Sequence, residues 1–224
     1  MKRYLSLFLV SILFMSCTQA QNCPEGINLL PMYGKVKKCS DQIQYDNEFI
    51  KTVDKVYKDR KQAAAHFVNR GWEYYYKGKP DTAMMRFNQA WLLDSLNADV
   101  YWGFGNLVGM QSKFKESLAL FNRSLKLNPA NAKVWESASN SYGQLFVQTQ
   151  NVSFLNSCIE YLKTAIKLDP NARTYAQLTA AYSYFMQKDS ARKYLAITDK
   201  IDRNAINPEV RKMLTGQDRK LNQH

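Results

Sequence analysis

The strongest constraint on the fold is a set of small and aromatic residues that recurs along the chain, with a shift of 34 residues between the first copies. The first copy contains Gly71, Tyr74, Ala83 and Phe87, and the second contains Gly105, Val108, Ser117 and Phe121. The third copy contains Trp135, Ser139, Tyr142, Cys158, Leu162 and Ala165. The fourth copy contains Tyr175, Thr179, Tyr182, Ala191 and Leu195. A period of this length indicates stacked units, because no single unit can bury its apolar face alone.

The composition agrees with a helical array. The chain has 224 residues, of which nine are glycine and six are proline, too few for a sheet rich in tight turns. Hydrophobic residues make up 46% of the chain, which is ordinary for a folded protein. This length suits one short array with its own core.

The repeated pattern resembles the tetratricopeptide repeat, a pair of antiparallel helices whose copies stack into a right-handed superhelix. The segments "YWGFGNLV" (101–108) and "SLALFNRSLKLNP" (117–129) match it most closely. The resemblance implies an all-α array of about four helix–turn–helix units over 64–205. The expected units are 64–97, 98–131, 132–171 and 172–205.

The third unit departs from the pattern by seven extra residues between Tyr142 and Cys158. Seven residues equal about two helical turns, at 3.6 residues per turn. One turn added to each helix would keep the pair in register, so we predict longer helices here and not a long loop. Ser95 and Arg203 stand where proline would end the first and fourth units.

The spacing also predicts which side chains form the core. We expect Gly71 to face Ala83 across the helix pair, with Tyr74 and Phe87 on the buried stripe beside them. Cys158 occupies a small-residue position of the pattern. We therefore expect it to be a buried thiol and not a redox sensor.

Residues 1–20 have the layout of a secretory signal, in which two basic residues precede an apolar stretch that is short for a bilayer span. Two processing routes are open. A general signal peptidase could cut after Ala20. Alternatively, "FMSC" resembles a bacterial lipobox, with Phe and Met where Leu and a small residue are usual, so Cys17 could carry lipid. Either route predicts a protein of the periplasm or cell envelope.

Export affects how the remaining cysteines are interpreted. Cys23 and Cys39 bracket a segment with little periodicity, within an N-terminal region over 21–40. A disulfide between them would stabilise the chain by about 3 kcal/mol in an oxidising compartment. We expect no metal site, because the two histidines, His66 and His224, lack the spacing of zinc ligands.

Helices are expected at both ends of the array. Residues 41–63 are helical in character and predict a capping helix over the first unit. The final region, 206–224, should contain a short closing helix over 207–216, because it opens with Asn-Pro and stops at glycine. The polar tail after it is expected to be disordered.

The resemblance places ligands in the groove lined by the first helix of each unit. Reading the same offsets in all four units gives fifteen candidate residues. They are Asn69, Trp72, Tyr75, Tyr76, Asp99, Trp102, Asn106, Met110, Lys133, Glu136, Asn140, Gln144, Arg173, Gln177 and Tyr184. Aromatic side chains supply contact area and amides can bond a peptide main chain. The alternative interpretation is that the chain's own segment over 41–66 covers the aromatic residues.

The predicted function is an exported scaffold or adaptor that holds a protein or peptide partner. We expect no enzymatic activity and no cofactor, because no Ser–His–Asp or Cys–His set is available. The formal net charge of +12 leaves two alternatives open: a basic envelope protein that binds anionic lipid or cell-wall polymer, and a structural subunit with a self-occupied groove. Nucleic-acid binding is not expected, because no recognised motif accompanies the charge.

Overall fold

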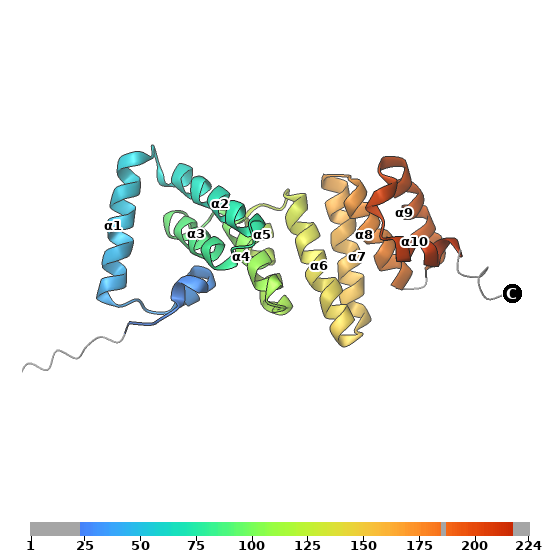
Figure 1. Cartoon of the computed structure of the whole chain (residues 1–224), viewed down its shortest axis with the longest axis horizontal. Coiled ribbons are helices and arrows are strands. Elements are labelled where there is room, and N and C mark those ends of the chain that lie inside the picture. Colours follow the sequence, from blue (N-terminus) through green and yellow to red (C-terminus); the bar gives the residue numbers. More distant parts are fainter. Residues whose placement is uncertain (1–22, 185–186, 217–224) are drawn as a thin grey trace, which may run out of the picture.

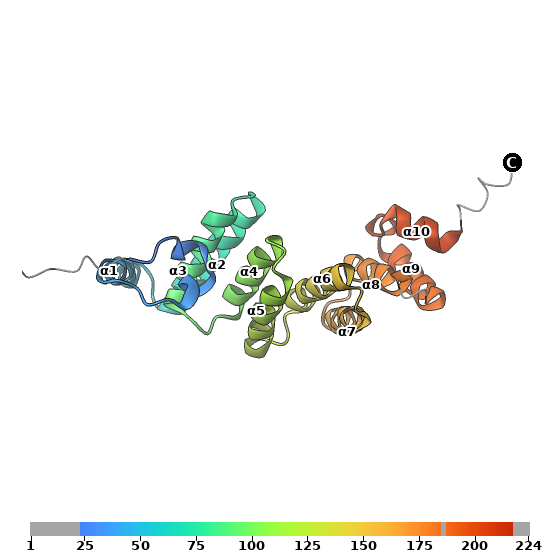
Figure 2. The ribbon, with the colours of Figure 1, turned by 90° about the horizontal axis from the view of Figure 1, so that it is seen from below.

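The computed structural model describes residues 23–184 and 187–216, and this part of the chain is all-helical (Figures 1 and 2). Four antiparallel pairs, α2–α3, α4–α5, α6–α7 and α8–α9, follow one another along the long axis. The helices are α1 Ser40–Val56, α2 Arg60–Tyr76, α3 Pro80–Leu93, α4 Ala98–Met110, α5 Phe114–Leu127, α6 Ala132–Thr149, α7 Val152–Leu168, α8 Ala172–Tyr184, α9 Lys188–Ile201 and α10 Pro208–Thr215. The predicted all-α repeat fold is confirmed.

Local chemistry sets where the first helices begin. Asn97 caps α4, because its side-chain oxygen accepts from the main-chain N–H of Asp99 at 3.0 Å. Asn131 caps α6 in the same way through Lys133 N at 3.1 Å. These caps satisfy N–H groups that have no partner within the helix.

The third unit has the longer helices that the sequence predicts. Helix α6 has 18 residues and α7 has 17, compared with 13 in α4 and 14 in α5. Only Gln150 and Asn151 separate the two long helices, with Gln150 in the left-handed conformation at φ 54°. The inserted residues therefore extend both helices.

Phe87 is central to the packing of the first two units. A Cβ placed on Gly71 would lie 2.6 Å from the Phe87 ring, so this ring is the nearest neighbour of Gly71. Gly103 of α4 faces the same ring from the next unit. Phe121 lies against Gly105 in the same manner. In the first two units, the aromatic ring of the second helix thus fills the space that the glycine leaves.

Tyr74 packs against the core of the first two units, as predicted, although it is only half-buried near the end of α2. Cations surround its ring, with the Arg70 guanidinium 5.1 Å and the Arg86 guanidinium 5.9 Å from the centroid. Arg70 also donates to the Tyr74 hydroxyl at 3.0 Å. The cation–π contacts therefore add to the apolar packing of this ring against the core.

The N-terminal segment is bound to the outer face of the first unit. The predicted disulfide between Cys23 and Cys39 is formed. Two short 3₁₀ helices, Ile27–Leu29 and Pro31–Lys35, pack against α3. The fully buried Asn88 joins them to α3, because it accepts from one main-chain N–H of the segment and donates to two of its carbonyls.

The predicted capping helix over 41–63 is interrupted, which corrects its bounds. Helix α1 ends at Val56, and α2 starts at Arg60 after Asp59, whose carboxylate accepts from Gln62 N at 2.8 Å. This side-chain cap was the overlooked signal for a new helix. Helix α1 is set apart from the array (Figure 1). Its Val53, Phe49 and Ile50 side chains pack with residues near the start of α2 and the end of α3.

The closing helix is present as α10. Asn207 caps it by accepting from Glu209 N at 2.8 Å, and Gly216 ends it with φ 71°. Leu214 packs with residues of α8 and α9, and Arg211 donates to Asp199 at 2.9 Å. The predictions for the signal over 1–20, including Cys17, and for the tail over 217–224 lie outside the described residues. No helix within the described ranges is long and apolar enough to cross a membrane.

Candidate functional site

The fifteen candidate residues lie on helices α2, α4, α6 and α8, the first helices of the four units. Helix α2 contacts α4 and α4 contacts α6, so these helices form one continuous face, which we call the first-helix face (Figure 2). On it the structure brings together two groups of candidates, an aromatic cluster at the α2–α4 end and a polar network at the α6–α8 end.

The aromatic cluster consists of Trp72, Tyr75, Tyr76 and Trp102. The indole rings of Trp72 and Trp102 lie 4.2 Å apart between centroids, across the junction of α2 and α4. Tyr76 stacks on Trp72 at 6.0 Å, and Tyr75 meets Trp72 edge-on at 5.3 Å. Tyr76 is 77% exposed, and the other three rings are half-buried. The cluster therefore presents aromatic surface to solvent.

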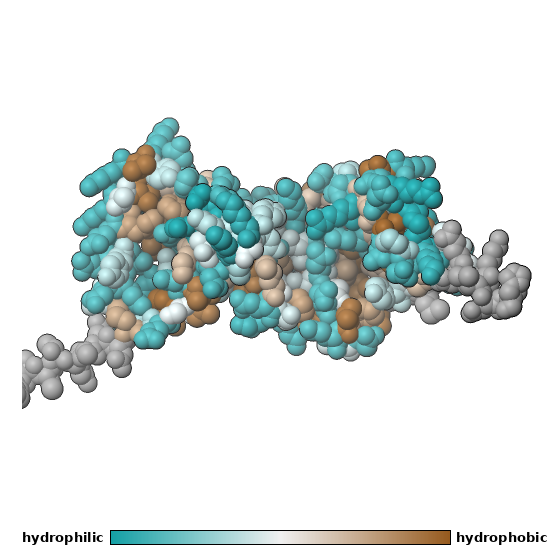
Figure 3. Space-filling model, in the orientation of Figure 1, coloured by the Kyte–Doolittle hydropathy of each residue, from teal (hydrophilic) through white to brown (hydrophobic). Residues whose placement is uncertain are grey.

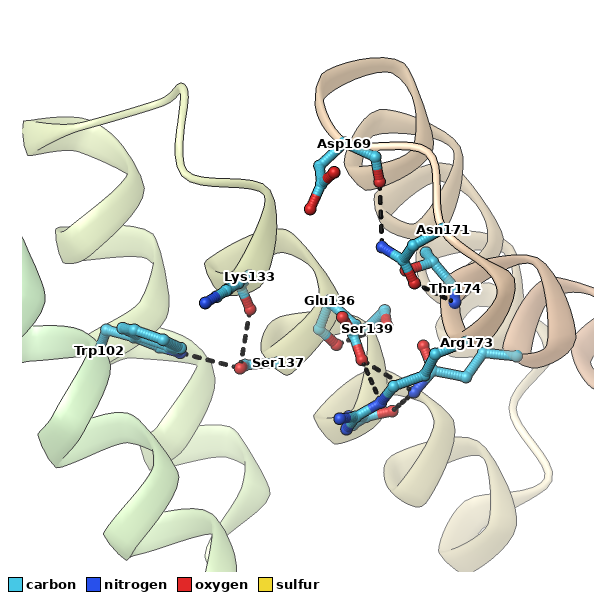
Figure 4. Close-up of polar contacts among 11 residues, drawn as sticks. Trp102, Lys133, Glu136, Ser137, Ser139, Asp169, Asn171, Arg173 and Thr174 are labelled. Carbon is cyan, nitrogen blue, oxygen red and sulfur yellow. Dashed lines mark hydrogen bonds and ion pairs between the residues drawn. The ribbon is translucent and has the colours of Figure 1, made fainter. Parts of the chain in front are cut away.

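Packing below the cluster fixes its geometry. Trp72 rests edge-on against the buried Phe87 at 5.4 Å. The Trp102 indole N–H donates to Ser137 Oγ at 2.9 Å, and Ser137 donates in turn to the Lys133 carbonyl (Figure 4). This chain of hydrogen bonds ties α4 to α6 and holds the Trp102 ring in place.

The helix that the alternative interpretation placed over these rings lies elsewhere. Helix α1 packs against the start of α2 and the end of α3, and the 3₁₀ segment packs on α3. The segment over 41–66 thus does not cover the aromatic cluster. A shallow hollow opens beside the cluster instead, bordered by Asn69, Trp72, Asp99, Trp102, Lys133 and, from the α7–α8 loop, Asp169.

The polar network joins α6 to α8. Arg173 Nε lies 2.8 Å from Glu136 Oε1 (Figure 4). The Gln177 amide donates to the same carboxylate at 3.3 Å and to Asn140 Oδ1 at 3.4 Å. The Glu136 side chain is only 14% exposed, whereas that of Arg173 is 74% exposed. The network thus buries the negative charge and leaves the positive one in solvent.

The charge of Arg173, in the polar network, acts on Tyr75 of the aromatic cluster. Burial raises the pKa of the Tyr75 hydroxyl, the neighbouring Tyr76 raises it further, and the charge of Arg173 lowers it.

A pocket of about 260 Å³ opens between α6, α7 and α8. We call it the inter-unit pocket. Four candidates line it, namely Asn140, Gln144, Gln177 and Tyr184. Its remaining lining residues are Ser139, Gly143, Phe146, Val147, Leu155, Cys158, Leu162, Ala180 and Ala181. Phe146 and Val147 were missed because they lie in the inserted part of the third unit, where the repeat offsets no longer apply.

Other candidates play a smaller part. The Asn106 side chain donates one of its two amide N–H groups to the Trp102 carbonyl of its own helix at 2.8 Å. Met110 is exposed at the end of α4. Asp99 accepts from the Asn131 side chain at 3.4 Å. Ser137, which anchors Trp102, was not recognised in the sequence because a lone serine carries no pattern.

The described residues hold no group of three or more metal-ligating side chains. Cys158 is buried, and burial raises the pKa of its thiol to about 12. The prediction of a buried core thiol is thus confirmed. Such a thiol remains protonated and unreactive near neutral pH.

Comparison with known proteins shows the fold alone. No protein-family profile matches the chain, and no curated protein matches it in sequence. A thermophilic TPR protein from Thermus thermophilus is similar in structure, with a TM-score of 0.57 and 17% identity over 71% of this chain and 83% of that one. PilF of Pseudomonas aeruginosa is also similar in structure, with a TM-score of 0.59 and 19% identity over 72% of this chain and 71% of that chain.

A third similar structure is the first TPR of Spaghetti (RPAP3), bound to the HSP90 peptide SRMEEVD. It gives a TM-score of 0.50 with 17% identity, over 56% of this chain and 98% of that chain. Together with the helix pairs and their packing, these similarities define the class: the chain has the fold of a tetratricopeptide repeat protein.

Proposed function

We propose that this chain is an exported scaffold or adaptor that binds a protein or peptide partner on its first-helix face. The observation that carries the proposal is the aromatic cluster. Four large rings lie together on this face, and the rings expose surface although Phe87 and Ser137 hold two of them in place. Rigid aromatic residues are enriched at protein interfaces, because they offer large contact area at low entropic cost.

The polar groups around the cluster suit a peptide main chain. Within the described residues, the Trp72 indole N–H makes no hydrogen bond and so is free to donate to a carbonyl. Asn140 and Gln144 are exposed amides on α6, further along the same face. Peptide binding to the TPR of Spaghetti is a fold-level analogy that supports this type of partner.

Location in the periplasm or cell envelope is part of the proposal. Its support is the signal-like pattern of residues 1–20, with either cleavage after Ala20 or lipid attachment at Cys17. The disulfide between Cys23 and Cys39 also suits an oxidising compartment. Attachment to the membrane would then depend on a lipid at Cys17.

Affinity capture from solubilised envelope tests the proposal. The bait is the chain from Gln21 onward, which retains every described residue, beside the variant Trp72→Ala/Tyr76→Ala/Trp102→Ala. A matched control removes three exposed apolar side chains elsewhere, by Tyr45→Ala/Val56→Ala/Leu96→Ala. We expect one set of partners to be lost with the aromatic variant alone. Equal capture by all three baits would refute the proposed site.

One observation favours a second candidate function, binding to anionic lipid or cell-wall polymer. Lys115 and Lys126 are exposed on α5, and neither forms an ion pair within the described residues. Such binding should weaken steeply between low and high salt, because screening acts on exposed charges. Binding through the aromatic cluster should change little over the same range.

A further inference from the structure

We propose that the inter-unit pocket receives one large apolar side chain of an extended partner segment, and that Arg173 binds a carboxylate three or four residues away in the same segment. This inference rests on the proposed function, because it describes the partner of the first-helix face. The pocket and the Arg173 guanidinium then bind one ligand, a peptide with an apolar residue and an acidic residue.

The size and lining of the pocket suit a single side chain. Its volume of about 260 Å³ is below the roughly 300–1,000 Å³ of pockets that enclose whole small molecules. Leu155 and Leu162 of α7 form its floor together with the uncharged thiol of Cys158. At its mouth, Val147 is 52% exposed and Tyr184 is 63% exposed.

The long helices of the third unit create this pocket. Phe146 and Val147 lie in the last two turns of α6, and the Phe146 ring approaches Tyr184 of α8 at 6.1 Å. Hydrophobic atoms show on the surface at the lower end of α6 and α7 in Figure 3. Apolar surface therefore continues outside the mouth of the pocket, where it would also contact the apolar side chain of the partner.

Charge complementarity selects the rest of the ligand. Arg173 Nε pairs with Glu136, and the guanidinium makes no hydrogen bond or ion pair with any other residue of the described part of the chain. The Glu136 carboxylate is itself largely buried, so the exposed charge beside the pocket is positive. Asp99 and Asp169 border the hollow near α4 and do not line the pocket. A free pair of guanidinium N–H groups matches a carboxylate.

Helix geometry gives the spacing between the two ligand groups. Arg173 precedes Ala180, which lines the pocket, by seven positions on α8, or roughly 10 Å at 1.5 Å per residue. An extended peptide advances about 3.3 Å per residue. An acidic residue at Arg173 thus lies three or four residues from the apolar residue in the pocket.

Amide side chains between the two points can bond the peptide backbone. Gln177 is held only by its bonds of 3.3 and 3.4 Å, and its buried Oε1 has no partner within the described part of the chain. An unpaired buried carbonyl is unfavourable, so rotation of this side chain to meet a main-chain N–H would be favoured. Asn140 and Gln144 stand on the opposite wall of the pocket.

A phage-displayed library of random dodecapeptides tests the inference. The library is selected on the chain from Gln21 onward, and enriched peptides are then measured by fluorescence anisotropy. We expect enriched sequences to pair Asp or Glu with Leu, Ile or Phe three or four positions away. A selection that enriches other sequences, or none, overturns the inference.

Three variants localise the binding. Arg173→Gln should weaken enriched peptides by about three- to fivefold, Arg173→Lys should restore part of the loss, and the pocket-filling Ala180→Leu should weaken them by about tenfold or more. The matched controls Arg192→Gln and Ala196→Leu change exposed positions of α9 and should have no effect. Circular dichroism checks that each variant is folded.

The same assay separates this inference from the proposed function. Binding that is lost in the Trp72→Ala/Tyr76→Ala/Trp102→Ala variant but retained in Arg173→Gln and Ala180→Leu would overturn the inference and leave the proposed function intact. Binding that all these variants retain would overturn both. Self-association that Ala180→Leu abolishes, with no peptide enriched, would make a second copy of the chain the occupant and overturn the peptide assignment.

Discussion

Replacing Gly103 by alanine should destabilise the array through a single side chain, that of Phe87. An added Cβ would lie 2.4 Å from two atoms of the Phe87 ring, where ordinary carbon contacts are about 3.5–4.0 Å. The ring cannot retreat, because it is 0% exposed and Gly71 of α2 also lies against it. A Cβ placed on Gly71 would come within 2.6 Å of the ring. The strain must therefore be absorbed by separating α2, α3 and α4.

Two opposing contributions set the magnitude. Overpacking a core typically costs about 1–3 kcal/mol, and this rigid contact belongs at the upper end of that range. Alanine in place of glycine inside a helix gains roughly 1 kcal/mol. The free energy of unfolding should therefore fall by about 2 kcal/mol in Gly103→Ala.

Gly143→Ala provides a matched control in α6. A Cβ there would meet only Cys158 Sγ, at 3.7 Å, which is an ordinary contact. This substitution should stabilise the protein by about 0.5–1 kcal/mol, because the propensity gain is unopposed. Urea unfolding followed by circular dichroism measures both changes.

A double-variant cycle tests the cause. Phe87→Leu removes the ring and is itself destabilising. In that background, Gly103→Ala should lose most of its cost, because the clashing atoms are absent. The reasoning about Phe87 fails if Gly103→Ala is as stable as the wild-type chain, or if its cost is the same with Leu at position 87.

Three further predictions follow from other contacts. Asn88→Ala should lower the free energy of unfolding by about 2–4 kcal/mol, because three main-chain groups of the N-terminal segment lose their hydrogen-bond partner. Limited proteolysis of this variant should cut the N-terminal segment first. Unchanged protection of the segment would contradict the role of Asn88. The hydrogen bond from Arg211 lowers the pKa of Asp199, so its stabilisation is complete above the ordinary carboxyl pKa of about 3.9 and is lost as pH falls below it. The melting temperature measured between pH 3 and 6 should contain a pH-dependent part that Arg211→Gln removes. Identical melting profiles for the two proteins would exclude the Arg211–Asp199 pair as the source of that part. Alkylation of Cys158 at pH 8 should be roughly a hundredfold slower in the folded chain than in urea, because burial raises the thiol pKa to about 12. Equal rates would show that the thiol is accessible.

Periodic features were predictable from the sequence because they are local. The 34-residue spacing gave the four helix pairs, and the count of seven extra residues gave the long α6 and α7. Asn207 and Gly216 marked the ends of α10 through capping chemistry that involves only near neighbours. The break between α1 and α2 was also encoded locally, in Asp59, but was overlooked.

The composition of the candidate site was partly predictable. Repeat offsets placed Trp72, Trp102, Glu136 and Arg173 on one face, because equivalent positions of stacked units share an orientation. The offsets could not show that Glu136 and Arg173 form an ion pair, or that Ser137 fixes Trp102. They also failed beyond the insertion, where Val147 reaches the mouth of the inter-unit pocket.

The sequence by itself thus determined the units of this protein, their helices and the face on which its unusual aromatics lie. Tertiary structure alone decided that Phe87 is held between glycines of two different units, and that Asn88 fastens the N-terminal segment to the outer face of α3. It also decided that the aromatic cluster stays uncovered by α1. The physical reason is that helix periodicity and capping depend on residues a few positions apart. Ring packing, buried hydrogen bonds and the course of a connecting segment depend instead on groups that meet only when the units stack.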